Sequence, residues 1–88
     1  MELQELRNEI DAIDKELVRL FCRRMDTVRA VAEYKKAHAV AVLDCSREEQ
    51  VLDRVSGGEC TYPDETRELY RSIMEISKKY QRRLNGGE

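Results

Sequence analysis

The first 43 residues contain neither glycine nor proline, and this feature limits what they can form. Apolar residues follow one another there at alternating steps of three and four, namely Leu3, Leu6, Ile10, Ile13, Leu17 and Leu20. Residues three and four apart lie on the same face of an α-helix, so this spacing is typical of an amphipathic helix. It predicts one long helix that starts near residue 2 and ends between residues 36 and 38.

The same helix face changes its character beyond Leu20. Where the apolar stripe should continue it carries Arg24, and after Val28 and Val31 it reaches Lys35. At 100° and 1.5 Å per residue, Arg24 and Lys35 differ by about 20° in direction and lie about 16 Å apart along the axis. The space between two such cations, floored by valines, suits a small dianion with an apolar ring. The alternative is that both side chains extend to solvent from the helix edge.

Two further helices are predicted from their end signals. Asp44 and Ser46 are good N-cap residues, and they predict a short second helix over about residues 45–55. Pro63 fits the first turn of a third helix, which carries apolar residues as far as Leu84. No strand-like alternation of apolar and polar residues occurs. The predicted fold class is therefore all-α, with a long, a short and a medium helix.

Length and composition limit the class of protein further. With 88 residues the chain has room for one small domain, residues 1–88, and its long helix cannot bury its whole apolar stripe within one chain, so we expect self-association. The net charge is −2, with 16 basic and 18 acidic residues interspersed, which argues against a nucleic-acid-binding surface. No apolar run approaches the length of a membrane span. Three cysteines without a C-x-x-C spacing, and a charged start to the chain, predict free thiols in the cytoplasm.

Arg7 stands about 25 Å from Arg24 along the predicted helix, since 17 residues separate them. It cannot reach the same small ligand within one chain. If Arg7 serves that site, it comes from an antiparallel helix of a partner chain. Otherwise it is a solvated surface residue.

The start of the second helix combines acidic and basic side chains. Free backbone N–H groups at a helix N-terminus favour anions, and Arg47 can bind a carboxylate with two parallel hydrogen bonds. Glu48 can accept a hydrogen bond from a substrate hydroxyl. The alternative is a helix start that is only capped and decorated with charges.

The third helix places two neutral polar residues, Ser77 and Gln81, on a stripe that is otherwise apolar. Buried hydroxyl and amide groups need hydrogen-bond partners. A ligand is one candidate, and a buried water or neighbouring backbone is the other. Together these features indicate a cation-rich helical pocket without a nucleophile–base pair. Such a pocket can bind an anion and stabilise charge.

These residues resemble the all-helical chorismate mutases over nearly the whole chain. The resemblance rests on four motifs, namely Leu6-Arg7-x-x-Ile10-x-x-Ile13-Asp14, Arg23-Arg24 followed by Val31 and Lys35, Asp44-x-x-Arg47-Glu48, and Ser77-x-x-x-Gln81. It implies an interlaced homodimer of three-helix chains that rearranges chorismate to prephenate, on the route to phenylalanine and tyrosine, without a cofactor or metal. The chain departs from the family where Ala41 stands in place of a frequent proline.

The resemblance also implies a role for each site residue. Lys35, Gln81 and Arg24 would be catalytic, with Lys35 and Gln81 donating to the ether oxygen of the breaking C–O bond. The substrate-binding residues would be Arg7 from the other protomer, Arg24, Val31, Lys35, Asp44, Arg47, Glu48, Ser77 and Gln81.

Two alternatives stay open at this point. An isochorismate pyruvate lyase shares the implied fold and cationic pocket, although Asp44, Arg47 and Glu48 favour the mutase. A non-catalytic helical dimerisation module fits the composition, but it leaves Arg24 and Lys35 on the apolar face unexplained.

Overall fold

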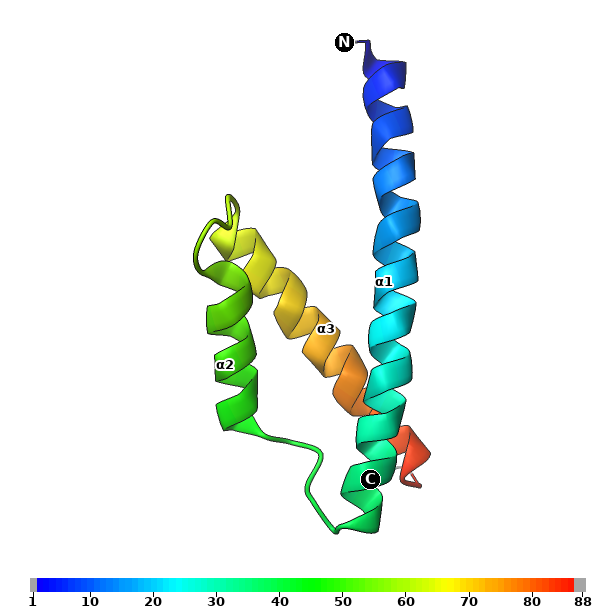
Figure 1. Cartoon of the computed structure of the whole chain (residues 1–88), viewed down its shortest axis with the longest axis vertical. Coiled ribbons are helices and arrows are strands. Elements are labelled where there is room, and N and C mark those ends of the chain that lie inside the picture. Colours follow the sequence, from blue (N-terminus) through cyan, green and yellow to red (C-terminus); the bar gives the residue numbers. More distant parts are fainter. Residues whose placement is uncertain (1, 87–88) are drawn as a thin grey trace.

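The computed structural model describes residues 2–86, which form three α-helices (Figure 1). They are α1 (Leu3–Ala37), α2 (Cys45–Ser56) and α3 (Pro63–Leu84). The all-α prediction is confirmed, and every helix end lies within one residue of the expected range. The ends of the predicted 1–88 domain, residue 1 and residues 87–88, lie outside the described residues.

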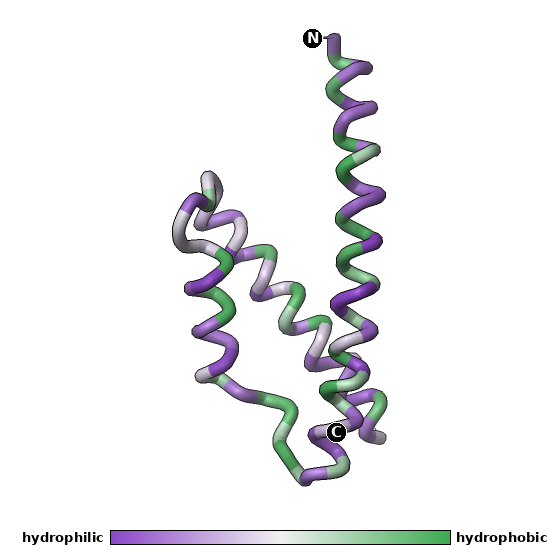
Figure 2. Tube along the Cα trace, in the orientation of Figure 1, coloured by the Kyte–Doolittle hydropathy of each residue, from purple (hydrophilic) through white to green (hydrophobic). Residues whose placement is uncertain are grey.

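α1 is much longer than the other two helices. The chain measures 53 Å along its longest axis and 25 and 16 Å along the others. The N-terminal half of α1 extends past α2 and α3, whereas its C-terminal half lies beside α3 (Figure 1). Hydrophobic residues nevertheless recur along its whole length (Figure 2). The six residues of the predicted stripe are 41–61% exposed in the single chain, namely Leu3, Leu6, Ile10, Ile13, Leu17 and Leu20.

The end of α1 reverses the chain direction within a few residues. The amide of Val40 donates to the carbonyl of Lys35 at 2.8 Å, and Ala39 adopts a left-handed backbone conformation with φ 54°. This pairing across five residues is typical of a Schellman motif, in which the left-handed position is usually glycine. The turn directs the segment before α2 back over the last turn of α1.

α2 begins at a side-chain cap, as the sequence predicts. The Oδ1 atom of Asp44 accepts a hydrogen bond from the backbone N–H of Arg47 at 3.0 Å. Of the two candidate caps, Asp44 is therefore the one that the chain uses, while Ser46 lies within the helix. Pro63 is the first residue of α3, where its missing N–H leaves no intrahelical hydrogen bond unmade.

A small hydrophobic core lies between α2 and α3. Val51, Leu52 and Met74 are buried, and Val55 and Tyr70 pack against them. α3 contacts both other helices and thereby joins them. None of the three described helices is apolar over a stretch long enough to cross a membrane.

Candidate anion-binding site

A cavity of about 320 Å³ lies between the three helices. Its lining residues come from the C-terminal half of α1, from the segment before α2, and from the facing sides of α2 and α3. They are Arg24, Thr27, Val28, Val31, Lys35, Val42, Asp44, Arg47, Glu48, Val51, Arg54, Met74, Ser77, Lys78 and Gln81.

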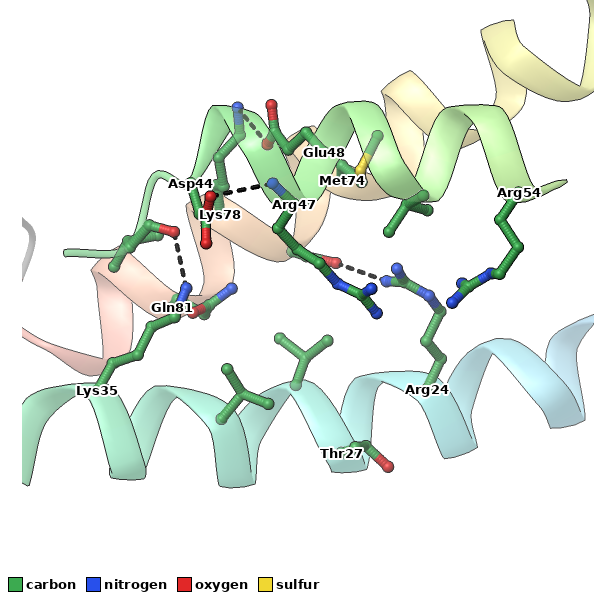
Figure 3. Close-up of a pocket in the computed structure, with 15 residues that line it drawn as sticks. Arg24, Thr27, Lys35, Asp44, Arg47, Glu48, Arg54, Met74, Lys78 and Gln81 are labelled. Carbon is green, nitrogen blue, oxygen red and sulfur yellow. Dashed lines mark hydrogen bonds and ion pairs between the residues drawn. The ribbon is translucent and has the colours of Figure 1, made fainter. Parts of the chain in front are cut away.

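The cavity is rich in positive charge. Two of its lining residues are acidic, and five are basic, namely Arg24, Lys35, Arg47, Arg54 and Lys78. The guanidinium groups of Arg24, Arg47 and Arg54 gather at one end, whereas Lys35 and Gln81 lie at the other (Figure 3). Clustered cations in a concave site attract anions and raise their local concentration.

Arg24 is held in place from α3. Its Nη1 atom donates to the hydroxyl of Ser77 at 3.1 Å, and that hydroxyl donates to the backbone carbonyl of Ile73 at 2.9 Å. The guanidinium also lies over the ring of Tyr70, 5.8 Å from its centroid. Ser77 is buried, so its hydroxyl needs partners, and backbone and Arg24 supply them. Arg24 therefore does not extend freely to solvent.

Lys35 and Gln81 form the other end of the cavity. The ammonium of Lys35 donates to the carbonyl of Val42 at 2.9 Å, so the turn after α1 holds this cation over the site. Gln81 is buried, and its Oε1 atom has no hydrogen-bond partner among the described residues. An unpaired buried amide oxygen costs free energy, and a bound ligand or water can remove that cost.

The start of α2 places two charged side chains at the cavity, Asp44 and Arg47. The carboxylate of Asp44 caps the helix, as described above, and so already accepts a hydrogen bond from the backbone N–H of Arg47. The side chain of Arg47 points from α2 into the space between α1 and α2 (Figure 3). Residue 47 is exposed in the single chain, which leaves its guanidinium free to bind an anion.

Glu48 is joined to α3 by an ion pair. The ammonium of Lys78 lies 3.0 Å from Glu48 Oε2 and 2.7 Å from Glu75 Oε1, and the Lys78 side chain is only 12% exposed. Its hydrogen bonds with Glu75 and Glu48 raise the pKa of Lys78 above its usual value. The hydrogen bond from Lys78, reinforced by its charge, lowers the pKa of Glu75. Lys78 is thus firmly protonated at neutral pH.

Eight of the nine predicted site residues line this cavity. They are Arg24, Val31, Lys35, Asp44, Arg47, Glu48, Ser77 and Gln81. Arg7 does not line it. It is exposed on the part of α1 that extends away from α3.

Sequence reasoning missed six lining residues, namely Thr27, Val42, Val51, Arg54, Met74 and Lys78. Arg54 could have been found, because it follows Arg47 by seven residues and so lies on the same face of α2 two turns later. For Lys78 the sequence indicates only a cation near the C-terminal end of α3, where it suits the helix dipole. Its ion pair with Glu48 depends on how α2 and α3 pack, which no local pattern indicates.

The fold and the cavity define an all-helical protein with a candidate binding site for a small anion. The site has cations at both ends and valines between them on α1. Among the lining residues there is no cysteine or histidine, and the one serine donates its proton to a backbone carbonyl. Such a site can hold and polarise an anionic ligand, but it lacks an activated nucleophile.

Comparison with known proteins identifies the family. The model of the chorismate mutase type II family matches residues 6–82. The chain belongs to this family.

Three curated relatives share parts of the chain. Over 55 residues it is 40% identical to the 4-amino-4-deoxychorismate mutase of Streptomyces venezuelae. This match covers 62% of the chain and 53% of the relative. It is 33% identical over 54 residues to the chorismate mutase of Methanocaldococcus jannaschii, covering 61% and 54%. It is also 38% identical over 50 residues to the T-protein of Haemophilus influenzae, covering 57% and 13%. The matched part thus spans at most about half the length of these relatives. No solved structure matches the chain significantly.

Proposed function

We propose that the protein is a chorismate mutase, which rearranges chorismate to prephenate. The observation that carries the proposal is the cavity with Arg24 and Arg47 at one end and Lys35 with the buried side-chain amide of Gln81 at the other. Chorismate is a dianion with two carboxylates on an apolar carbon framework. Its size and charge fit a cavity of about 320 Å³ with this charge pattern.

The reaction is an internal rearrangement. The C–O bond between the ring and the enolpyruvyl arm breaks while a C–C bond forms between the other ends of the same two groups. No atom enters or leaves, so neither a nucleophile nor a cofactor is required. The protein has to hold the enolpyruvyl arm over the ring, so that the free energy of substrate binding keeps the reacting atoms in the geometry of the rearrangement. It also has to stabilise the negative charge that develops on the ether oxygen.

The site residues divide these tasks between them. Arg24 and Arg47 bind the carboxylates, and the hydrogen bond to Ser77 keeps Arg24 oriented before the substrate arrives. Lys35 and Gln81 donate hydrogen bonds to the ether oxygen. Glu48 accepts a hydrogen bond from the ring hydroxyl.

We further propose that the active protein is a homodimer in which Arg7 completes the site of the partner chain. Two observations support a dimer. The six apolar stripe residues on the N-terminal half of α1 are 41–61% exposed in the single chain. Arg7 lies on this same half, about 25 Å from Arg24 along the helix axis. An antiparallel second copy of α1 covers the stripe and brings Arg7 of each chain toward the other chain's cavity.

Separate incubations with chorismate and with isochorismate test the proposed reaction. We expect chorismate to be consumed and prephenate to form. Pyruvate release from isochorismate, without prephenate from chorismate, would show a lyase instead. A helical module without catalysis would convert neither compound, and a bicyclic dianion that mimics the transition state would not raise its melting temperature.

A further inference from the structure

Lys78 forms an ion pair with Glu48, the carboxylate that faces the ring substituent in the proposed function. This pair is buried more deeply than the other ion pairs of the described residues, with side-chain exposures of 12% for Lys78 and 25% for Glu48. It lies on the side of the cavity farthest from α1 in Figure 3. Through this pair Lys78 joins α3 to the start of α2 at the edge of the proposed site.

The pair leaves Glu48 with one oxygen for a ligand. Lys78 contacts the Oε2 atom, while Oε1 forms no ion pair or hydrogen bond with another described residue. An ionised carboxylate can accept several hydrogen bonds. Glu48 can therefore accept from a ring hydroxyl through Oε1 while Lys78 fixes the orientation of the group through Oε2.

The same pair weakens the negative charge that a cationic substituent needs. The cavity has two carboxylates, of which Asp44 caps α2 and Glu48 is paired with Lys78, which it shares with Glu75. Lys78 itself is held protonated, since both of its partners raise its pKa. An ammonium group at the ring position would thus meet the Lys78 cation beside Glu48, which weakens the attraction between that carboxylate and the ammonium. Like charges in a partly desolvated site repel each other and disfavour the wrong ligand.

We propose that Lys78 is a specificity-determining residue, which positions Glu48 for a ring hydroxyl and disfavours a ring ammonium. The comparison with relatives makes this distinction relevant, because one relative is named a 4-amino-4-deoxychorismate mutase. That substrate carries an amine, protonated at neutral pH, where chorismate carries a hydroxyl. The inference rests on the proposed function, and it assigns this chain to the hydroxyl-bearing substrate.

The test compares kcat/KM for chorismate and for 4-amino-4-deoxychorismate in three proteins. These are the wild type, Lys78→Met and the control Lys79→Met, whose side chain is exposed on the same helix and does not line the cavity. Methionine keeps the length and packing of the lysine stem without its charge. We expect the wild type to favour chorismate, and Lys78→Met to raise the relative kcat/KM for the amino substrate by about tenfold or more. Lys79→Met should leave the ratio unchanged.

The outcomes separate the inference from the function on which it rests. If the wild type converts chorismate and Lys78→Met keeps the wild-type ratio within about twofold, the specificity role of Lys78 is wrong while the mutase function stands. If the wild type converts neither compound, both are wrong. A wild type that prefers the amino substrate also overturns the inference. Should Lys78→Met fail to fold by circular dichroism, Lys78→Gln, which keeps a hydrogen-bond donor but no charge, answers the same question.

Discussion

The guanidinium of Arg24 on α1 donates to the hydroxyl of Ser77 on α3 at 3.1 Å, and so ties the cationic face of one helix to the polar stripe of another. Ser77 is in turn fixed by the carbonyl of Ile73. The cation is therefore oriented by the protein before any ligand binds. Such preorganisation is what electrostatic catalysis requires, since no free energy is then spent on turning the dipoles during the reaction.

Ser77→Ala should lower kcat/KM for chorismate by about 10- to 100-fold, because a hydrogen bond to a charged group contributes about 1.5–3 kcal/mol. Arg24→Ala should cost about 10²–10³-fold or more, as it removes the cation itself. Steady-state kinetics measures both effects. Ser72→Ala, at an exposed position of α3, is the matched control and should keep wild-type activity. If Ser77→Ala has wild-type kinetics, the hydrogen bond from Arg24 to Ser77 is not what orients the guanidinium for catalysis.

The exposed apolar stripe of α1 predicts that a single charged substitution within it dissociates the proposed dimer. Ile13 is 52% exposed in the single chain, and Ile13→Asp would place a carboxylate in the interface. We expect sedimentation equilibrium to give the dimer mass for the wild type and the monomer mass for Ile13→Asp, with loss of activity. Lys15→Asp, on the opposite face of the helix, should remain dimeric. A monomeric, active wild type would contradict the proposed assembly.

The proposed sharing of active sites between two chains predicts that two inactive variants complement each other. Arg7→Ala and Lys35→Ala should each lose about 10²–10³-fold in turnover, since each removes a cation from the site. In a mixed dimer, the chain with Arg7→Ala keeps its own Lys35 and receives Arg7 from its partner, so one of the two sites is intact.

Unfolding the two variants together and refolding them should therefore restore about a quarter of wild-type activity, because half of the dimers are mixed and each has one good site. The control mixes the variants without unfolding, under conditions in which the chains do not exchange. If refolded mixtures stay inactive, Arg7 does not act across the interface.

The small core predicts that Leu52 contributes strongly to stability. It is 5% exposed and belongs to the cluster between α2 and α3. Leu52→Ala should reduce the free energy of unfolding by about 2–5 kcal/mol, through lost burial and the cavity that remains. Leu52→Met, which preserves volume, should cost less than about 1.5 kcal/mol. Urea denaturation at one fixed protein concentration measures both, since a dimer's stability depends on concentration.

The Glu75–Lys78–Glu48 group predicts how stability depends on pH. The pKa of Glu75 is lowered in the folded protein, so its contribution is complete above its ordinary value of 4.5 and is lost as the pH falls through the lowered value. The pKa of Lys78 is raised, so its contribution is complete below its ordinary value of 10.5 and is lost as the pH rises through the raised value. The melting temperature of the wild type should exceed that of Glu75→Gln at pH 7, and the difference should vanish in acid. A difference that persists below the folded pKa would contradict this origin.

The sequence predicts the helices well because their signals are local. The three- and four-residue spacing of α1, the cap at Asp44 and the proline at the start of α3 each act within one or two turns. Eight of the nine predicted site residues also line one cavity, since helical periodicity places Arg24 and Lys35 on the face of α1 that α3 covers. The family resemblance supplied their roles.

Contacts between helices could not be predicted in the same way. The hydroxyl of Ser77 was expected to meet a ligand, a water or backbone, and it meets Arg24 as well as backbone. Lys35 was expected to face a ligand between it and Arg24 or to extend to solvent, and the contact that it makes is to the Val42 carbonyl, which the turn at Ala39 brings over α1. These partners depend on tertiary packing rather than on spacing along the chain.

Because α1 is one continuous helix, the direction of its apolar stripe around the helix axis is fixed relative to the face that carries Arg24 and Lys35. Between Leu20 and Arg24 the helix has no break, so an inserted or deleted residue would turn one face by about 100° relative to the other and shift it by about 1.5 Å. Both halves would still be amphipathic helices, and each could still pack. Their alignment would be lost, however, and with it the proposed meeting of Arg7 and Arg24. The number of residues in this one helix would therefore set the distance between the two active sites of the proposed dimer.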